Sequence, residues 1–162
     1  MKTLIVYYSL EGNTGYVVDK IAKASGADTL QLIPKKAYAS KGFKKFLWGG
    51  KSAMMAEKPP LESYDVDLAQ YDRIVFGFPV WAGNVTPPLR TFIADNQQDI
   101  KEKRIAAFAC QSGSGAEKAF AKLKEAIGIT SLETEAVFID PKSKRTDETD
   151  AAIEAFGQEL AE

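Results

Sequence analysis

Short apolar segments recur along the chain, and stretches with a different hydrophobic period separate most of them. Five of these segments are rich in β-branched and aromatic residues, which predicts β-strands. The first, third and fourth are apolar at nearly every position, as expected of central parallel strands that helices cover on both faces. The five segments are residues 4–8, 29–33, 74–78, 105–109 and 136–139.

The stretches between the strands carry apolar residues three or four positions apart, which is the period of an amphipathic helix. Thr86-Pro87-Pro88 predicts the start of one helix, and Gly128 predicts the end of another. Alternating strands and helices indicate an α/β protein with a doubly wound, five-stranded parallel sheet in three α/β/α layers. The predicted helical faces are formed by residues 17–24, 89–93, 120–127 and 153–160.

Length and composition indicate a single domain over residues 1–162. The chain has 162 residues, of which 45% are hydrophobic and 27% charged, as in one ordinary globular unit. The connection from Pro34 to Tyr71 is too long for one loop. Its segment Gly42 to Ala56 is basic and aromatic, and we expect it to be partly helical.

The chain has no histidine, which removes several kinds of chemistry. Ser-His-Asp and Cys-His nucleophiles, zinc held by histidine and haem held by a proximal histidine are all excluded. Cys110 is the one cysteine, so no internal disulfide or CxxC pair can form, and we interpret it as an inert residue at a strand end. We expect no metal site. The chemistry that remains must come from carboxylates, lysine, tyrosine or a bound cofactor.

The charge is nearly balanced, with 21 basic and 22 acidic residues and a net charge of -1. No overall field therefore favours nucleic acid or an anionic membrane. The apolar runs are shorter than the roughly 20 residues of a membrane-spanning helix, and the first apolar run is shorter than that of a signal peptide. We expect a cytoplasmic protein.

Ligands of an open parallel sheet bind beyond the carboxyl ends of the strands, so the loops that follow the strands are the candidate site. After the first strand, Ser9-Leu10-Glu11-Gly12-Asn13-Thr14 leads directly into a helix. Its backbone N–H groups and three polar side chains can bind a phosphate. The loops after the third and fourth strands let a flat ligand approach the main chain. They consist of Pro79, Val80, Trp81, Ala82, Gly83 and Asn84, and of Gln111, Ser112, Gly113, Ser114 and Gly115, which follow Cys110.

Each of these loops also has an ordinary structural interpretation. Loops rich in serine and glycine connect strands to helices in many α/β proteins without binding a ligand. Trp81 offers a face on which a ring can stack, but a tryptophan also commonly fills a gap between helix and sheet. The combination of three suitable loops at neighbouring strand ends favours the binding site.

The segment Ser9 to Thr14 resembles the FMN phosphate loop of flavodoxins, whose usual form is a hydroxyl residue, any residue, Thr or Ser, Gly, Asn and Thr. The other two loops match the ring-flanking loops of that family in position, over essentially the whole chain. The resemblance implies the strand order 2-1-3-4-5 and one FMN bound non-covalently. It also implies that Ser9 to Thr14 hold the phosphate, while Pro79 to Asn84 lie along the ring and Gln111 to Gly115 line its pyrimidine side.

Two positions depart from the family pattern. Glu11 stands where flavodoxins usually have a hydroxyl residue, so we expect its carboxylate to point to solvent and away from the phosphate. The loop from Cys110 to Gly115 has no aromatic residue, although many flavodoxins place a tyrosine there against the outer face of the flavin. One face of the ring is therefore open, or is covered by Trp48 or a methionine of the long connection.

The resemblance implies an electron carrier that serves redox partner proteins, and it leaves two alternatives open. One is a small FMN-dependent NAD(P)H:quinone-type reductase, and the other is an interaction module without flavin. No acidic residue falls between Asp28 and Glu57, and the lysines of that stretch include Lys41, Lys44 and Lys45. This stretch is either the solvated face of an amphipathic helix or a docking patch for an acidic redox partner.

Overall fold

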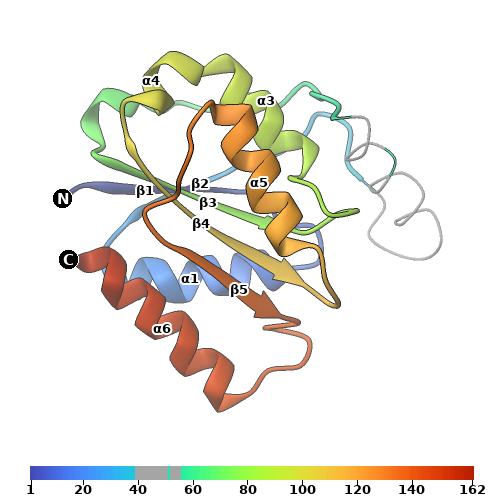
Figure 1. Ribbon diagram of the computed structural model, residues 1–162, viewed down its shortest axis with the longest axis vertical. Helices are drawn as coiled ribbons and strands as arrows, with labels where there is room; N and C mark the ends of the chain where they lie inside the picture. The colour runs from blue at the N-terminus through green and yellow to red at the C-terminus, as the bar shows by residue number, and fades with distance from the viewer. Residues whose placement is uncertain (39–50, 52–55) are drawn as a thin grey trace.

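The computed structural model describes residues 1–38, 51 and 56–162, which form a parallel sheet with helices on both faces (Figure 1). The strand order is β2-β1-β3-β4-β5, which confirms the predicted doubly wound fold. All neighbouring strands of this sheet pair in parallel. The strands are β1 (Thr3–Tyr7), β2 (Asp28–Gln31), β3 (Arg73–Pro79), β4 (Arg104–Gln111) and β5 (Glu135–Ile139).

The helices form two layers, with α1 and α6 on one face of the sheet and α3, α4 and α5 on the other (Figure 1). The four predicted helical faces belong to α1, α3, α5 and α6. Helix α4 was not predicted, because five residues are too few to show a hydrophobic period. The helices are α1 (Asn13–Ser25), α3 (Pro87–Asp95), α4 (Gln97–Lys101), α5 (Ala116–Ile127) and α6 (Asp147–Ala161), and a 3₁₀ turn, η1 (Leu68–Gln70), precedes β3.

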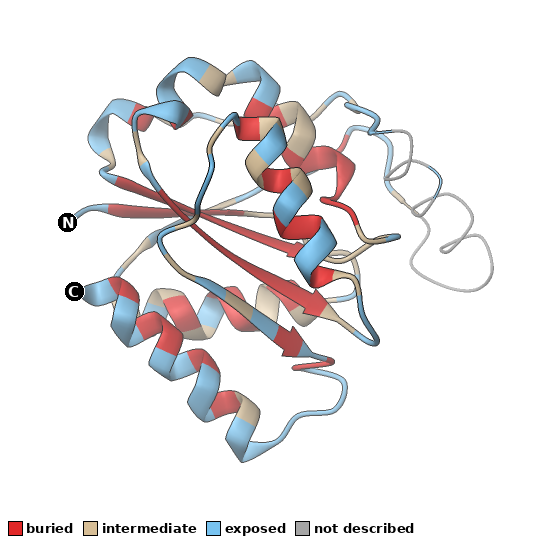
Figure 2. Cartoon of the chain, viewed as in Figure 1, coloured by how far each residue is buried: buried red, intermediate tan, exposed pale blue. Residues whose placement is uncertain are grey.

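Burial confirms the central position of β1, β3 and β4, while the edge strands β2 and β5 are mostly exposed or half-buried (Figure 2). Successive side chains of a strand point to opposite faces. Ile5 and Val75 therefore belong to the core under α1 and α6, whereas Val6 and Phe76 belong to the core under α3 and α5. These two cores hold the carboxyl ends of the strands at one edge of the molecule.

The two described ends of the long connection after β2 lie beside each other. Pro34 pairs with Leu61 in an isolated antiparallel bridge, which ties the beginning of the connection to its later part. The segment predicted to be partly helical, Gly42 to Ala56, lies outside the described residues apart from Lys51 and Ala56.

An ion pair between a buried arginine and a partly exposed glutamate ties the start of β3 to the segment before β5. Arg73 is only 2% exposed, and its guanidinium donates two hydrogen bonds of 2.8 Å to the carboxylate of Glu133. It donates a third, of 2.5 Å, to the carbonyl of Leu160 at the end of α6. Glu133 also pairs with the more exposed Arg104. The Arg73 guanidinium and, to a smaller extent, Arg104 hold the pKa of the Glu133 carboxyl below its ordinary value.

This lowered pKa predicts how stability depends on pH. The ion pair stabilises the fold above the unfolded pKa of glutamate, about 4.3, and its contribution is lost as the pH falls through the lower folded pKa. Glu133→Gln should therefore lower the free energy of unfolding by ~1 kcal/mol at neutral pH and by clearly less near pH ~3. Urea denaturation at both pH values measures the difference. Glu135→Gln removes an exposed charge two residues away and should change stability by under ~0.5 kcal/mol at either pH. If Glu133→Gln lowered the free energy of unfolding equally at both pH values, the proposed connection between the Glu133 pKa and stability would be wrong.

Candidate functional site

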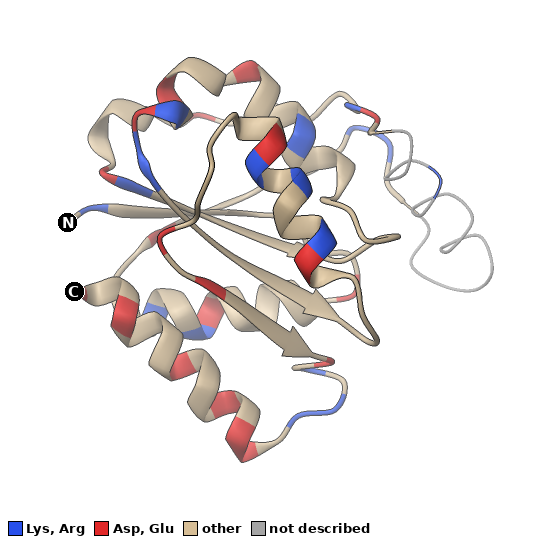
Figure 3. Ribbon diagram, viewed as in Figure 1, with Lys and Arg blue, Asp and Glu red and all other residues tan. Residues whose placement is uncertain are grey.

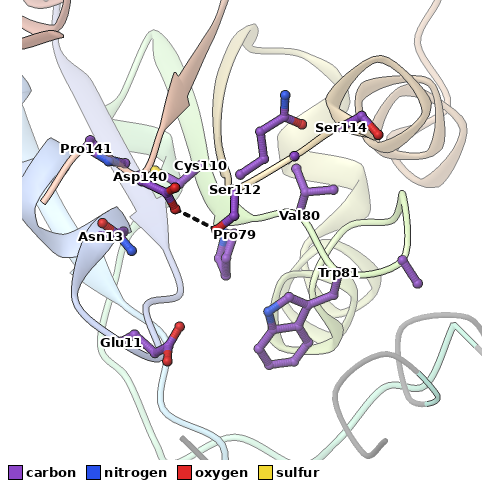
Figure 4. Close-up of a pocket in the computed structure, with 13 residues that line it drawn as sticks. Glu11, Asn13, Pro79, Val80, Trp81, Cys110, Ser112, Ser114, Asp140 and Pro141 are labelled. Atoms are coloured by element: carbon purple, nitrogen blue, oxygen red, sulfur yellow. Dashed lines mark hydrogen bonds between the residues drawn. The ribbon is translucent and has the colours of Figure 1, made fainter. Parts of the chain in front are cut away.

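Four loops at the carboxyl ends of the strands surround one cavity of about 460 Å³ (Figure 4). Three of them are the loops predicted from the sequence, after β1, β3 and β4, and the fourth is the loop between β5 and α6. The residues that line the cavity are Glu11, Asn13, Pro79, Val80, Trp81, Ala82, Cys110, Gln111, Ser112, Gly113, Ser114, Asp140 and Pro141.

The cavity is not lined by all of the residues predicted to form the site. Ten of them contribute to its wall, and the others lie behind it or beside it. Those outside the lining are Ser9, Leu10, Gly12, Thr14, Gly83, Asn84 and Gly115.

The loop after β1 leads into α1 through a glycine. Gly12 is the residue before the helix and has φ +94°, a conformation that glycine adopts without strain. The first turn of α1 contains no acidic residue, so the positive end of the helix dipole is not neutralised there. The Ser9 hydroxyl oxygen accepts a hydrogen bond of 3.1 Å from the N–H of Gly15, which keeps its own O–H available as a donor. This loop has the local structure of an anion site.

The Thr14 hydroxyl is buried in the first turn of α1. Thr14 is 1% exposed, and its Oγ1 has no hydrogen-bond partner of ordinary strength among the described residues. Its polar neighbour is the Cys110 thiol, a weak hydrogen-bonding group. Burial raises the pKa of that thiol to about 12, so Cys110 stays protonated and unreactive at neutral pH. Thr3 and Thr86 also have buried hydroxyls without a partner among the described residues, so this property does not by itself mark Thr14 as a ligand contact.

Asn13 connects the first loop to the loop after β5. Its side-chain oxygen accepts hydrogen bonds from the N–H groups of Lys142 at 2.9 Å and Ser143 at 3.2 Å. The oxygen is therefore used inside the protein, and the side-chain nitrogen is the group that can donate to a ligand. In Figure 4 the Asn13 amide lies at the cavity wall between Glu11 and Pro141.

Glu11 is exposed, as expected, but it also lines the mouth of the cavity (Figure 4). The expectation that its carboxylate points wholly away from the site is therefore only partly met. If a ligand places its phosphate in the loop after β1, the Glu11 carboxylate lies near the mouth of the cavity that holds this ligand.

The loop after β3 turns back on itself within two residues. Ala82 and Gly83 have φ of +50° and +65°, and the N–H of Asn84 donates to the carbonyl of Trp81 at 2.9 Å. Positive φ at both central residues defines a type I′ turn. The Asn84 side-chain oxygen accepts hydrogen bonds from Arg90 and from the N–H of Val85, so it fixes the loop to the protein rather than facing the cavity.

Trp81 belongs to an aromatic cluster and also lines the cavity. Its ring packs edge-on against Tyr8 and Tyr38, with centroids 5.6 Å and 5.2 Å away. The same side chain lines the cavity (Figure 4). Tyr38 belongs to the connection after β2, so this cluster also attaches that connection to the site.

The loop after β4 comes very close to the loop after β3. Gly115 has φ +112°, and a Cβ atom on it would lie 3.1 Å from the Cα of Gly83. The side-chain oxygen of Gln111 accepts a hydrogen bond of 3.0 Å from the N–H of Ala116, which caps the start of α5. Ser112 reaches across to the fourth loop, where its hydroxyl donates to Asp140 at 2.5 Å (Figure 4).

The fourth loop was missed in the sequence. Asp140 follows β5 directly and has φ +43°, and its carboxylate accepts from Ser112 and pairs with Lys144 at 2.7 Å. The signal that could have found it was its position, since it also begins at the carboxyl end of a strand. Among the described residues, no group of three or more His, Cys, Asp or Glu side chains could hold a metal ion.

The sequence profile of the flavodoxin family matches residues 2–150. The chain therefore belongs to the flavodoxin family, which confirms the resemblance seen in the sequence. Membership of this family supports FMN as the cofactor. In the described part of the chain, no helix is long and apolar enough to cross a membrane.

Solved structures of similar fold include a protein of Bacteroides eggerthii DSM 20697 that is provisionally named a flavoprotein. It has a TM-score of 0.76 and 23% identity, over 99% of this chain and 98% of that one. A flavoprotein of Lactobacillus acidophilus NCFM in complex with FMN has a TM-score of 0.73 and 21% identity, over 84% of this chain and 92% of that one. A flavodoxin from the domain Archaea has a TM-score of 0.56 and 18% identity, over 99% and 96%. These similarities show the fold.

Proposed function

We propose that residues 1–162 act as one cytoplasmic FMN-binding domain that carries electrons between redox partner proteins. The observation that carries this proposal is the convergence of four strand-end loops on one cavity. Its volume of about 460 Å³ falls in the range of ligand pockets. Membership of the flavodoxin family and the FMN in the Lactobacillus acidophilus flavoprotein support the choice of ligand.

In this proposal the loop Ser9 to Thr14 holds the phosphate. The backbone N–H groups of Leu10, Glu11 and Gly12 face it at the N-terminus of α1. The hydroxyls of Ser9 and Thr14 and the side-chain nitrogen of Asn13 donate further hydrogen bonds. The Ser9 hydroxyl supports this assignment, because its oxygen accepts from the N–H of Gly15 and its own O–H stays available as a donor at the start of α1.

The other loops hold the ring of the flavin. The loop Pro79 to Asn84 lies along it, with Trp81 as the aromatic contact and the Asn84 side chain anchoring the loop from behind. Gln111 to Gly115 line its pyrimidine side. Trp81 is held in place by Tyr8 and Tyr38, so its contact surface is fixed before the ligand arrives. FMN supplies the redox chemistry when bound, while the protein orients the ring and tunes its environment.

Two features favour a carrier over an enzyme. The chain has no histidine, and Cys110 is a protonated thiol at neutral pH, so neither of these usual proton-transfer groups acts at the cavity wall. One observation favours the alternative, an NAD(P)H:quinone-type reductase. The Gln111–Gly115 wall carries no aromatic ring, so these residues do not block a small acceptor from that side of the cavity.

The partner surface of the carrier is a further part of the proposal. The lysine-rich stretch that includes Lys41, Lys44 and Lys45 suits an acidic redox partner, because opposite charges steer association. These three lysines lie outside the described residues.

Titration of the apo-protein with FMN tests the cofactor. We expect quenching of flavin fluorescence to saturate with a dissociation constant below ~10 µM, since phosphate and ring are both held. Absence of quenching at that concentration would remove the proposed function.

A second experiment separates the carrier from the reductase. Under anaerobic conditions we expect stepwise reduction of the FMN-loaded protein to resolve two one-electron steps. NADH and NADPH should be oxidised negligibly in the presence of quinones. A single two-electron step with rapid nicotinamide turnover would instead establish the reductase.

A further inference from the structure

The loop between β5 and α6 is the most basic part of the described chain near the cavity. Figure 3 shows positive residues in this loop, followed by acidic residues along α6. The loop carries Lys142, Lys144 and Arg145 within four positions. It is held against the phosphate loop, because the side-chain oxygen of Asn13 accepts from the N–H groups of Lys142 and Ser143.

Two of the three cations are occupied by carboxylates. The Lys144 ammonium lies 2.7 Å from Asp140, and the Arg145 guanidinium lies 2.7 Å from Asp150. Lys142 has no ion pair among the described residues. Lys142 is therefore the one cation of this loop whose charge no carboxylate of the described residues balances.

The Lys142 side chain extends over the beginning of α1. A Cβ atom built on Gly12 would lie 2.9 Å from Lys142 Nζ and 3.5 Å from Lys142 Cδ. The ammonium group thus rests against the residue that precedes the helix, where the backbone N–H groups already favour an anion. Gly12 leaves room for this approach because it has no side chain.

We propose that Lys142 is the cation that pairs with the phosphate of the bound flavin, and that the loop between β5 and α6 is a fourth wall of the binding site. This inference rests on the proposed function. It also bears on Glu11, since the positive charge of Lys142 beside Gly12 offsets the repulsion between that carboxylate and a phosphate. The backbone of Lys142 is fixed by Asn13, so its side chain is the part that responds to the ligand.

Paired titrations with FMN and riboflavin test this role, because riboflavin has the same ring and no phosphate. Lys142→Gln should weaken FMN binding about tenfold, which is the size of one charge-assisted hydrogen bond. Riboflavin affinity should change by less than about twofold. The loss of FMN affinity should shrink as salt rises, since ions screen an exposed pair. Lys142→Arg should restore most of the FMN affinity.

Arg145→Gln is the matched control, because it also removes one positive charge from this loop, but from a guanidinium held by Asp150, which does not line the cavity. It should leave the ratio of FMN to riboflavin affinity unchanged. Equal ratios in the wild type and Lys142→Gln, or an equal fall in both variants, would overturn the role of Lys142. Wild-type protein that binds neither flavin would instead overturn the proposed function itself.

Discussion

Replacing Gly115 by alanine should weaken FMN binding by about a hundredfold, because the two loops that we propose to hold the ring meet at this residue. An alanine Cβ would lie 3.1 Å from Gly83 Cα and 3.2 Å from Val80 Cγ1. The first of these is backbone and cannot rotate away. Gly115 also has φ +112°, where a side chain adds strain of ~1–3 kcal/mol. The clash and the backbone strain can be relieved only if the two loops move apart. That movement would change the width of the proposed site for the flavin ring.

Isothermal titration with FMN measures this loss, and urea denaturation measures the accompanying change in stability. Gly113→Ala is the control for stability, since nothing lies within 4 Å of a Cβ there and its φ is not positive. It should change the free energy of unfolding by less than ~0.5 kcal/mol. If Gly115→Ala bound FMN as tightly as the wild type, the contact between the two loops would have no part in shaping the site.

The central strands could be predicted from the hydrophobic pattern, whereas the full strand order came from the resemblance to flavodoxins. Continuous apolar strands must be covered on both faces, which places β1, β3 and β4 in the centre. Ligands of such a sheet bind at its carboxyl edge, which selects the loops. The edge strands β2 and β5 were harder to predict from the sequence. They are half-exposed, so their hydrophobic pattern is weaker than that of a central strand.

Side-chain direction was the part that could not be predicted. Asn84 was expected beside the ring, yet it is tied to Arg90 and Val85 behind the loop wall. Arg90 belongs to α3, so the direction of the Asn84 side chain depends on how this helix packs on the core. That packing involves residues far away in the sequence. Trp81 is a second example. It contacts Tyr38, which lies in the connection after β2, and no local sequence pattern predicts that this connection packs against the loop after β3.

The loop between β5 and α6 was missed in the sequence for a related reason. Nothing in Asp140-Pro141-Lys142-Ser143 resembles a ligand loop, and the role of the segment arises from contacts across the sheet edge. Its bond to Asn13 joins residues 129 positions apart in the chain. Its bond from Ser112 to Asp140 joins residues 28 positions apart. Long-range contacts of this kind have no short-range signature in a single sequence.

Gly77 of β3 should be the least replaceable glycine for stability. Gly77→Ala is expected to lower the free energy of unfolding by ~3 kcal/mol, near the upper end of typical overpacking effects. A Cβ there would lie 2.3 Å from Cζ and 2.7 Å from Cε1 of the Phe108 ring on the neighbouring strand β4. Phe108 is fully buried and packs against Phe138 and Phe156, so its ring cannot move aside without disturbing the core under α1 and α6.

A double-mutant cycle separates this clash from a general effect of changing the strand. Phe108→Leu alone should destabilise by ~1–2 kcal/mol, because it removes buried ring atoms. Combined with Gly77→Ala, it should restore at least ~1 kcal/mol of stability relative to the sum of the single changes, since the smaller side chain makes room for the new methyl group. Urea denaturation of the four proteins at one pH measures the coupling. Strict additivity would show that the ring of Phe108 is not what excludes a side chain at position 77, and that the requirement for glycine lies in the backbone of β3 instead.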